Sequence, residues 1–156
     1  MNLKKASQKQ EKKVAKELNA NTVVASGAMW GSKGDVRNDE YLIECKMTQR
    51  PFYSLTKSVW EKIQKEALKD GMRIPMMCID LENGKKQFIV MLIDDLPPKA
   101  KTAVECDTEG LLEMHPFQIS FRIKETKGHY ANVVETSWGT FAIMDRQEYL
   151  HYFKEV

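Results

Sequence analysis

The sequence lacks three features that would assign it to a specialised class: a long apolar run, paired cysteines and a large net charge. No segment approaches the ~20 consecutive apolar residues that span a membrane. The first residues, MNLKKASQKQEKK, contain no apolar stretch of the signal-peptide type. The formal net charge of the 156 residues is +2, so the overall charge does not by itself indicate a nucleic-acid partner.

The few cysteines and histidines show neither disulfide nor zinc-binding spacing. The chain has three of each, and no two cysteines lie close together in the sequence. Cys45 and Cys78 fall within apolar, strand-like runs, so we expect buried free thiols in a reducing cytoplasm. The histidines are scattered, and a structural zinc site is not expected.

The composition is that of an ordinary globular domain. Hydrophobic residues make up 42% of the chain and charged residues 29%, which is enough for one core with a polar surface. Pro97 and Pro98 interrupt the strand pattern and open a less regular, acidic stretch that extends to about Pro116. We therefore expect a core over 1–96, an elaboration of the same domain over 97–137, and a closing strand and helix over 138–156.

Local patterns predict a chain of helices and strands. Helices are indicated where Gly and Pro are absent and apolar residues recur at helical spacing, and strands where β-branched and aromatic residues cluster. The order of these segments predicts an α/β or α+β fold. The expected helices are 7–19, 56–69 and 147–153, and the expected strands are 23–26, 41–46, 74–81, 87–93, 117–123 and 138–144.

The segment from Ser26 to Lys46 carries the clearest chemical signal. Side chains alternate faces along a strand, so Glu44 and Lys46 are predicted to project to the same side. Asp35 precedes this strand by a turn-rich spacer. Acidic groups at the end of a buried strand are costly unless a cation compensates them, which indicates a functional site.

The predicted first helix offers a third acid. Its apolar stripe consists of Val14, Ala15 and Leu18, and Glu11 falls in the middle of that stripe. Glu11 is interpreted either as a boundary residue at the helix start or as an acid that faces the site. The lysines of this helix, including Lys9 and Lys12, lie on the opposite face, where they are either solvated or available to DNA.

A glycine-rich loop follows the predicted strand 23–26. It does not have the order of a phosphate-binding P-loop, but its glycines allow a ligand to approach the backbone. Ser32 and Lys33 are placed for phosphate contacts. Trp30 is interpreted either as a stacking or wedging residue or as part of the core.

Asp35, Glu44 and Lys46 together suit metal-assisted hydrolysis of a phosphodiester. Carboxylates are hard oxygen ligands of the kind that Mg²⁺ prefers, and Mg²⁺ also keeps several waters and binds phosphate oxygens. Bound metal activates a water and neutralises charge in the transition state. Lys46 is expected to orient or deprotonate that water, or to stabilise the phosphate.

With these residues the sequence resembles the PD-(D/E)xK nuclease superfamily, and within it the archaeal-type Holliday-junction resolvases. The resemblance implies a restriction-endonuclease-like mixed β-sheet flanked by helices, here with an extra C-terminal β-rich segment. It implies a metal site of Asp35, Glu44 and the Cys45 carbonyl, with Glu11 as an additional acid and Lys46 as the catalytic lysine. Ser26 matches a serine that is important in these resolvases. The matching segments are Gln10-Glu11, Val23-Val24-Ala25-Ser26, Gly34-Asp35-Val36, Leu42-Ile43-Glu44-Cys45-Lys46 and the strand that begins Ile74-Pro75.

The resemblance also implies partners and a cofactor. We expect a homodimer that uses Mg²⁺ to make paired nicks in branched DNA, and we expect Mn²⁺ to substitute for Mg²⁺. The expected location is the cytoplasm, which would be that of the host if the protein is phage-encoded. Two alternatives stay open: a nuclease of the same superfamily acting on duplex, flapped or restriction-site DNA, and a non-catalytic DNA-binding module. Residues 117–123 and the last helix are candidates for either the dimer interface or the core. The side chains expected to contact DNA are Lys9, Lys12, Trp30, Ser32, Lys33, Arg37, Thr48 and Arg50.

Overall fold

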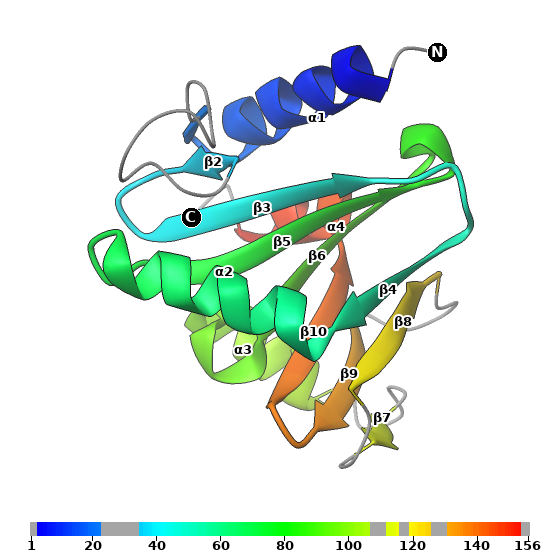
Figure 1. The fold of residues 1–156 in the computed structure, drawn as a ribbon. Coiled ribbons are helices and arrows are strands. Elements are labelled where there is room, and N and C mark those ends of the chain that lie inside the picture. Colours follow the sequence, from blue (N-terminus) through cyan, green and yellow to red (C-terminus); the bar gives the residue numbers. More distant parts are fainter. Residues whose placement is uncertain (1–2, 23–34, 107–111, 116–118, 126–130, 154–156) are drawn as a thin grey trace.

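The computed structural model shows an α/β fold in which one mixed β-sheet carries helices on both faces (Figure 1). The structure describes residues 3–22, 35–106, 112–115, 119–125 and 131–153. The helices are α1 (Leu3–Glu17), α2 (Lys57–Lys69), α3 (Pro98–Cys106) and α4 (Arg146–Phe153), with short 3₁₀ turns at Glu82–Gly84 and Ile93–Asp95. The strands are β1 (Asn21–Thr22), β2 (Val36–Arg37), β3 (Tyr41–Met47), β4 (Phe52–Thr56), β5 (Ile74–Leu81), β6 (Lys86–Leu92), β7 (Leu112–His115), β8 (Ser120–Lys124), β9 (Ala131–Thr136) and β10 (Gly139–Asp145).

Eight strands form the main sheet, in the order β1-β2-β3-β5-β6-β10-β9-β7. β3 and β5 are parallel, as are β7 and β9, and the remaining neighbours are antiparallel. The parallel pair requires a crossover, which α2 supplies. β4 and β8 pair only with each other, as an antiparallel two-stranded ribbon outside the main sheet.

The two faces of the sheet carry separate apolar cores. On one face, α1, α3 and α4 pack through Val14, Ala100, Val104 and Tyr149 against the sheet. On the other face lie α2 and the ribbon, and Trp60 of α2 is fully buried. A strand covered on both faces is apolar throughout, and this accounts for β5, in which seven of eight residues are buried.

Several predicted elements are confirmed. β3, β5 and α2 lie where the patterns indicate, and the Thr56 hydroxyl caps α2 by accepting a hydrogen bond from the Val59 amide. The turn between β5 and β6 contains Asn83 and Gly84 at positive φ angles, 58° and 94°, which these two residue types adopt more readily than others. α4 (Arg146–Phe153) matches the helix predicted over 147–153, and the Asp145 carboxylate caps it by accepting from the Glu148 amide at 2.9 Å.

Other predictions are wrong. Residues after Pro97 form α3 rather than an irregular segment, because proline fits the first position of a helix. β4 and β9 were not expected. The predicted strand 117–123 is confirmed only in part. β8 begins at Ser120 and buries Phe121 and Ile123, whereas Ile119, just before the strand, is 74% exposed, and residues 117 and 118 lie outside the described residues.

The described side chains of the candidate dimer-interface segments pack largely into the core of the chain itself. Phe121 and Ile123 of β8 pack against α2 and the sheet, and Tyr149 of α4 packs in the core on the opposite face. Among the described helices, none is long and apolar enough to cross a membrane.

Candidate active site at the edge of the sheet

Asp35 is held beside β3 by two backbone contacts. Its amide donates to the Ile43 carbonyl at 3.1 Å, and its carboxylate Oδ2 accepts from the Cys45 amide at 2.8 Å. The short strand β2 continues from Asp35 and pairs antiparallel with β3. These contacts place Asp35 next to Glu44, although the two acids are nine residues apart in the sequence.

Glu44 and Lys46 project from the same face of β3, as the alternation of strand side chains predicts. The Lys46 Nζ lies 3.4 Å from Glu44 Oε1. Ile43, by contrast, packs in the core on the α1 side. Glu44 and Lys46 therefore face the side of the sheet that carries α2 and the ribbon, where Tyr53 of β4 interacts electrostatically with both.

α1 approaches the same edge from the other face of the sheet. Gln10, 3% exposed, donates from Nε2 to the Lys46 carbonyl at 2.8 Å and to the Cys78 carbonyl at 3.4 Å. These bonds fasten α1 across β3 and β5. Glu11 is less buried than Gln10 and lies near enough to Asp35 for their charges to interact. The centre of the inward stripe is thus Gln10, and Glu11 lies at its border, facing Asp35.

The Asp35 carboxylate favours the protonated forms of its two acidic neighbours, Glu44 and Glu11. Burial, and then the neighbouring Asp35 charge, raises the pKa of Glu44 to about 7. Burial also raises the pKa of Asp35, although the Cys45 amide, the Lys46 charge and a hydrogen bond with Glu44 each act to lower it. The pKa of Glu11 is raised by burial and by Asp35. Such a cluster of perturbed carboxyls has an excess of negative charge that a cation would neutralise.

Lys46 stays protonated in this setting. Although burial acts in the opposite direction, Glu44, Tyr53 and Asp35 together raise the pKa of the Lys46 ammonium. A general base must be unprotonated at the working pH. Lys46 is therefore suited to orient a water or to stabilise a phosphate, and not to deprotonate the water.

The residues present fit a magnesium ion better than a transition metal. Asp35 and Glu44 supply oxygen donors, and Mg²⁺ is held by one or two carboxylates with waters and substrate phosphates completing its shell. Within the described ranges, no group of three or more His, Cys, Asp and Glu side chains is arranged to hold a metal. The thiols of Cys45 and Cys78 are unsuited to ligation, because burial raises the pKa of both.

The residues predicted to contact DNA have different surroundings. Ser26, Trp30, Ser32 and Lys33 lie outside the described residues. Lys9 and Lys12 are exposed on the outer face of α1, as predicted.

Arg37 is already engaged within the protein. Its Nη1 donates to the Asp70 carboxylate at 3.0 and 3.1 Å, and Arg73 also binds Asp70. The Thr48 hydroxyl accepts from the Arg50 amide, while the Arg50 side chain is exposed and lies 6.0 Å from the centre of the Phe52 ring. Arg37 and Thr48 are therefore weaker candidates for DNA contacts than Arg50.

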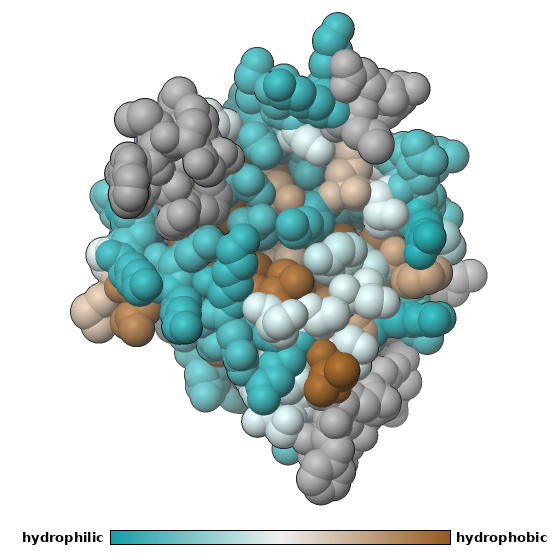
Figure 2. Space-filling view, in the orientation of Figure 1, coloured by the Kyte–Doolittle hydropathy of each residue, from teal (hydrophilic) through white to brown (hydrophobic). Residues whose placement is uncertain are grey.

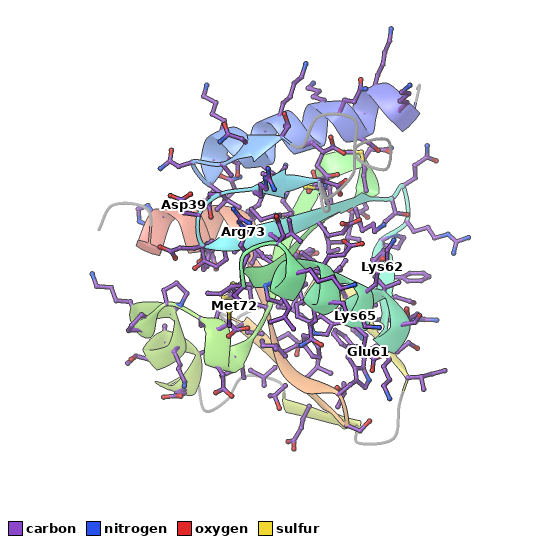
Figure 3. All side chains as sticks on the ribbon, turned by 60° about the vertical axis from the view of Figure 1, so that its left-hand side comes forward. Asp39, Glu61, Lys62, Lys65, Met72 and Arg73 are labelled. Carbon is purple, nitrogen blue, oxygen red and sulfur yellow. The ribbon has the colours of Figure 1, made fainter. Side chains whose placement is uncertain are left out.

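Three residues near the site were missed by sequence reasoning. Gln10 was recognisable as lying one helical turn before Val14, on the buried face. Tyr53 gave no signal, because β4 itself was not recognised. Lys62 lowers the pKa of Asp35 through its charge, and Figure 3 shows it on the exposed side of α2 with Glu61 and Lys65. It adds a cation at the rim of the acidic cluster.

Comparison of the chain with protein-family models, curated proteins and solved structures gives no match.

Proposed function

We propose that the protein is a Mg²⁺-dependent, structure-selective DNA endonuclease with a restriction-endonuclease-like core, and specifically a homodimeric Holliday-junction resolvase. The proposal is carried by one observation: the fold brings the Asp35 and Glu44 carboxylates together beside the Lys46 ammonium, with Glu11 near Asp35. The resemblance of the sequence to archaeal-type resolvases supports the choice of a branched substrate.

The chain's residues have separate roles in this proposal. Asp35, Glu44 and the Cys45 carbonyl would hold Mg²⁺, with Glu11 as a further acid. When bound, the ion would supply a nucleophilic water and neutralise developing charge on the phosphate. The Cys45 amide keeps the Asp35 carboxylate in place through its 2.8 Å hydrogen bond. Gln10 fixes α1 against β3 through its hydrogen bond to the Lys46 carbonyl, so that Glu11 stays near Asp35.

Lys46 contributes positive charge where the phosphate would be attacked. Its ammonium is held next to Glu44 and remains protonated, so it stabilises charge on the phosphate and orients the attacking water. Removing one preorganised donor of this kind typically costs about 10²–10³ in rate. We therefore expect Lys46→Ala to cut DNA on the order of a hundredfold or more slowly, with near-normal binding.

A cleavage assay tests the proposal. With Mg²⁺, the protein should place symmetric nicks in a synthetic four-way junction and leave a linear duplex of the same sequence largely intact. Asp35→Asn and Lys46→Ala should abolish or strongly reduce cutting, whereas Lys99→Ala, at an exposed position on α3, should cut normally. Undiminished cutting by Asp35→Asn would refute the assignment of the site.

The same assay separates the alternatives. Equal cutting of junction and duplex identifies a general nuclease and rejects the resolvase. Binding without cutting, with Mg²⁺ and Mn²⁺ alike, identifies a non-catalytic DNA-binding module. A protein that elutes as a monomer and still makes paired nicks contradicts the homodimer.

A further inference from the structure

The two-stranded ribbon of β4 and β8 has an apolar inner face and a polar outer face. Leu55, Phe121 and Ile123 are buried against α2 and the main sheet. The opposite side of the ribbon follows from the register, which pairs Phe52 with Lys124 and Ser54 with Arg122. Directly opposed residues share a face, so these four side chains together form the outer face of the ribbon.

Two arginines gather on the one aromatic ring of this outer face. The Arg122 Cζ lies 4.5 Å from the centre of the Phe52 ring, and the Arg50 Cζ lies 6.0 Å from it. Both distances are within the range of a cation–π interaction. The ring thus holds two exposed guanidinium groups close together, from segments that are about seventy residues apart in the sequence.

No anion within the described part of the chain neutralises this group. The ion pairs formed by described residues do not include Arg50, Arg122 or Lys124. The other three arginines are all paired: Arg37 and Arg73 bind Asp70, and Arg146 binds Asp80. Like charges held near one another repel, so this arrangement favours an external anion.

The ribbon lies next to the acidic site. Tyr53 follows Phe52 in β4, and its side chain interacts with Lys46 and Glu44. Consecutive residues of a strand point to opposite faces. One strand therefore contributes Tyr53 to the neighbourhood of the acids and Phe52 to the basic outer face.

The chemistry of the surface selects the kind of partner. The face of the molecule that includes α2 and the ribbon is mainly hydrophilic, and apolar residues are exposed there in small separate patches (Figure 2). A guanidinium group held by stacking keeps its N–H donors free, and their fork matches the oxygens of a phosphate. Paired arginines with a nearby lysine suit a polyanion such as a nucleic-acid backbone.

We propose that Arg50 and Arg122, held on Phe52, bind the phosphodiester backbone of the DNA strand that enters the acidic site. The inference rests on the proposed nuclease function and adds a binding surface to it. It also gives a role to part of the elaboration at 97–137, because β8 brings Arg122 to a strand that follows the catalytic segment. Phe52 acts as a positioning residue that keeps both guanidinium groups in place.

The salt dependence of binding tests this surface without the metal. A fluorescently labelled four-way junction is titrated in EDTA at 50–200 mM KCl with wild-type protein and with Arg50→Gln/Arg122→Gln. Each lost phosphate contact reduces the slope of log K against log salt by about 0.9, so the double variant should lose about 1.8. The ratio of wild-type to double-variant affinity should then fall roughly tenfold as the salt concentration rises from 50 to 200 mM.

Matched variants separate charge from structure. Lys99→Gln removes one exposed charge from the opposite face of the sheet and should leave the slope unchanged. Arg122→Lys keeps the charge and should retain the wild-type slope, whereas Arg122→Gln should lose about 0.9. Equal slopes for Arg122→Lys and Arg122→Gln would overturn the proposal, as would an unchanged slope for the double variant. Thermal melting confirms that each variant is folded.

The outcomes distinguish this inference from the function on which it rests. If the wild-type protein cuts the junction while the double variant keeps its full salt slope, the surface is refuted and the nuclease stands. If the wild type binds the junction but never cuts it, and the double variant shows the predicted loss of salt slope, the nuclease is refuted and the surface stands. If it binds no DNA, both fail, and binding to an acidic protein instead would overturn the choice of partner.

Discussion

The buried ion-pair network around Arg146 gives the sharpest test of what holds the fold together. Arg146 is 0% exposed. Its Nη1 donates to Asp80 Oδ1 at 2.7 Å and its Nε to Glu17 Oε2 at 3.2 Å. The network therefore joins α4 to β5 and to the end of α1, the helix that also carries Gln10 and Glu11.

Replacing Arg146 with methionine keeps much of the side-chain volume and removes the charge. The Asp80 side chain is only 4% exposed, so its carboxylate loses its partner without gaining full hydration. Breaking one side of a buried pair in this way typically costs about 3–5 kcal/mol. We expect the free energy of unfolding of Arg146→Met to fall by that amount, which is a large part of the stability of a typical domain.

The double variant Asp80→Leu/Arg146→Met should regain much of the loss. Replacing Asp80 and Arg146 with apolar residues removes the two most buried charges, while Glu17, whose side chain is 14% exposed, keeps Lys13 and Gln147 as partners. Such a replacement of both members of a buried pair is often close to neutral. Urea denaturation at pH 7 of the wild type, both single variants and the double variant gives the coupling energy. Lys57→Met, which removes an exposed pair with Glu61, serves as the control and should change stability by about 0.5 kcal/mol or less.

Two results would refute this reasoning. If Arg146→Met lowers the free energy of unfolding by less than about 1 kcal/mol, the buried pair contributes no more than an exposed salt bridge does. A double variant as unstable as the two single losses combined would show that the two side chains stabilise the protein independently.

Three further predictions concern the site and the sheet. Because the folded-state pKa of Glu44 is about 7, above its ordinary 4.5, the metal-free protein should lose stability as pH rises between these values. The loss is on the order of 3 kcal/mol; urea denaturation in EDTA at pH 5 and 8 should show it, and Glu44→Gln should flatten it. Gln10→Leu should cost about 1–3 kcal/mol in urea denaturation, because it leaves buried carbonyls unpaired; unchanged stability would contradict that role for Gln10. Gly139→Ala should lower the melting temperature through a loss of about 1–3 kcal/mol, since φ is 150° and a Cβ would lie 2.6 Å from Leu92 Cδ2; an unchanged melting temperature would refute this.

Local patterns were enough to predict β3, β5 and α2, and the common facing of Glu44 and Lys46. These features depend on the two- and 3.6-residue periods of strand and helix, which each segment carries in its own residues. The caps of α2 and α4 are local in the same sense, because Thr56 and Asp145 bond to amides three residues away. Pro98 was misjudged because the same residue that breaks a strand can begin a helix.

Contacts between distant segments were decided by the tertiary structure. The inward position of Gln10 depends on carbonyls of β3 and β5, 36 and 68 residues further along the chain. The pairing of β4 with β8 places Arg122 on Phe52. The sequence periodicity of either strand does not indicate this pairing, because the register between strands is set by what each face packs against. The sequence by itself therefore predicted Asp35 and Glu44 as an acidic site, because residue type and strand alternation are local. The folded chain decided how burial and neighbouring charges shift the pKa values of these two carboxyls.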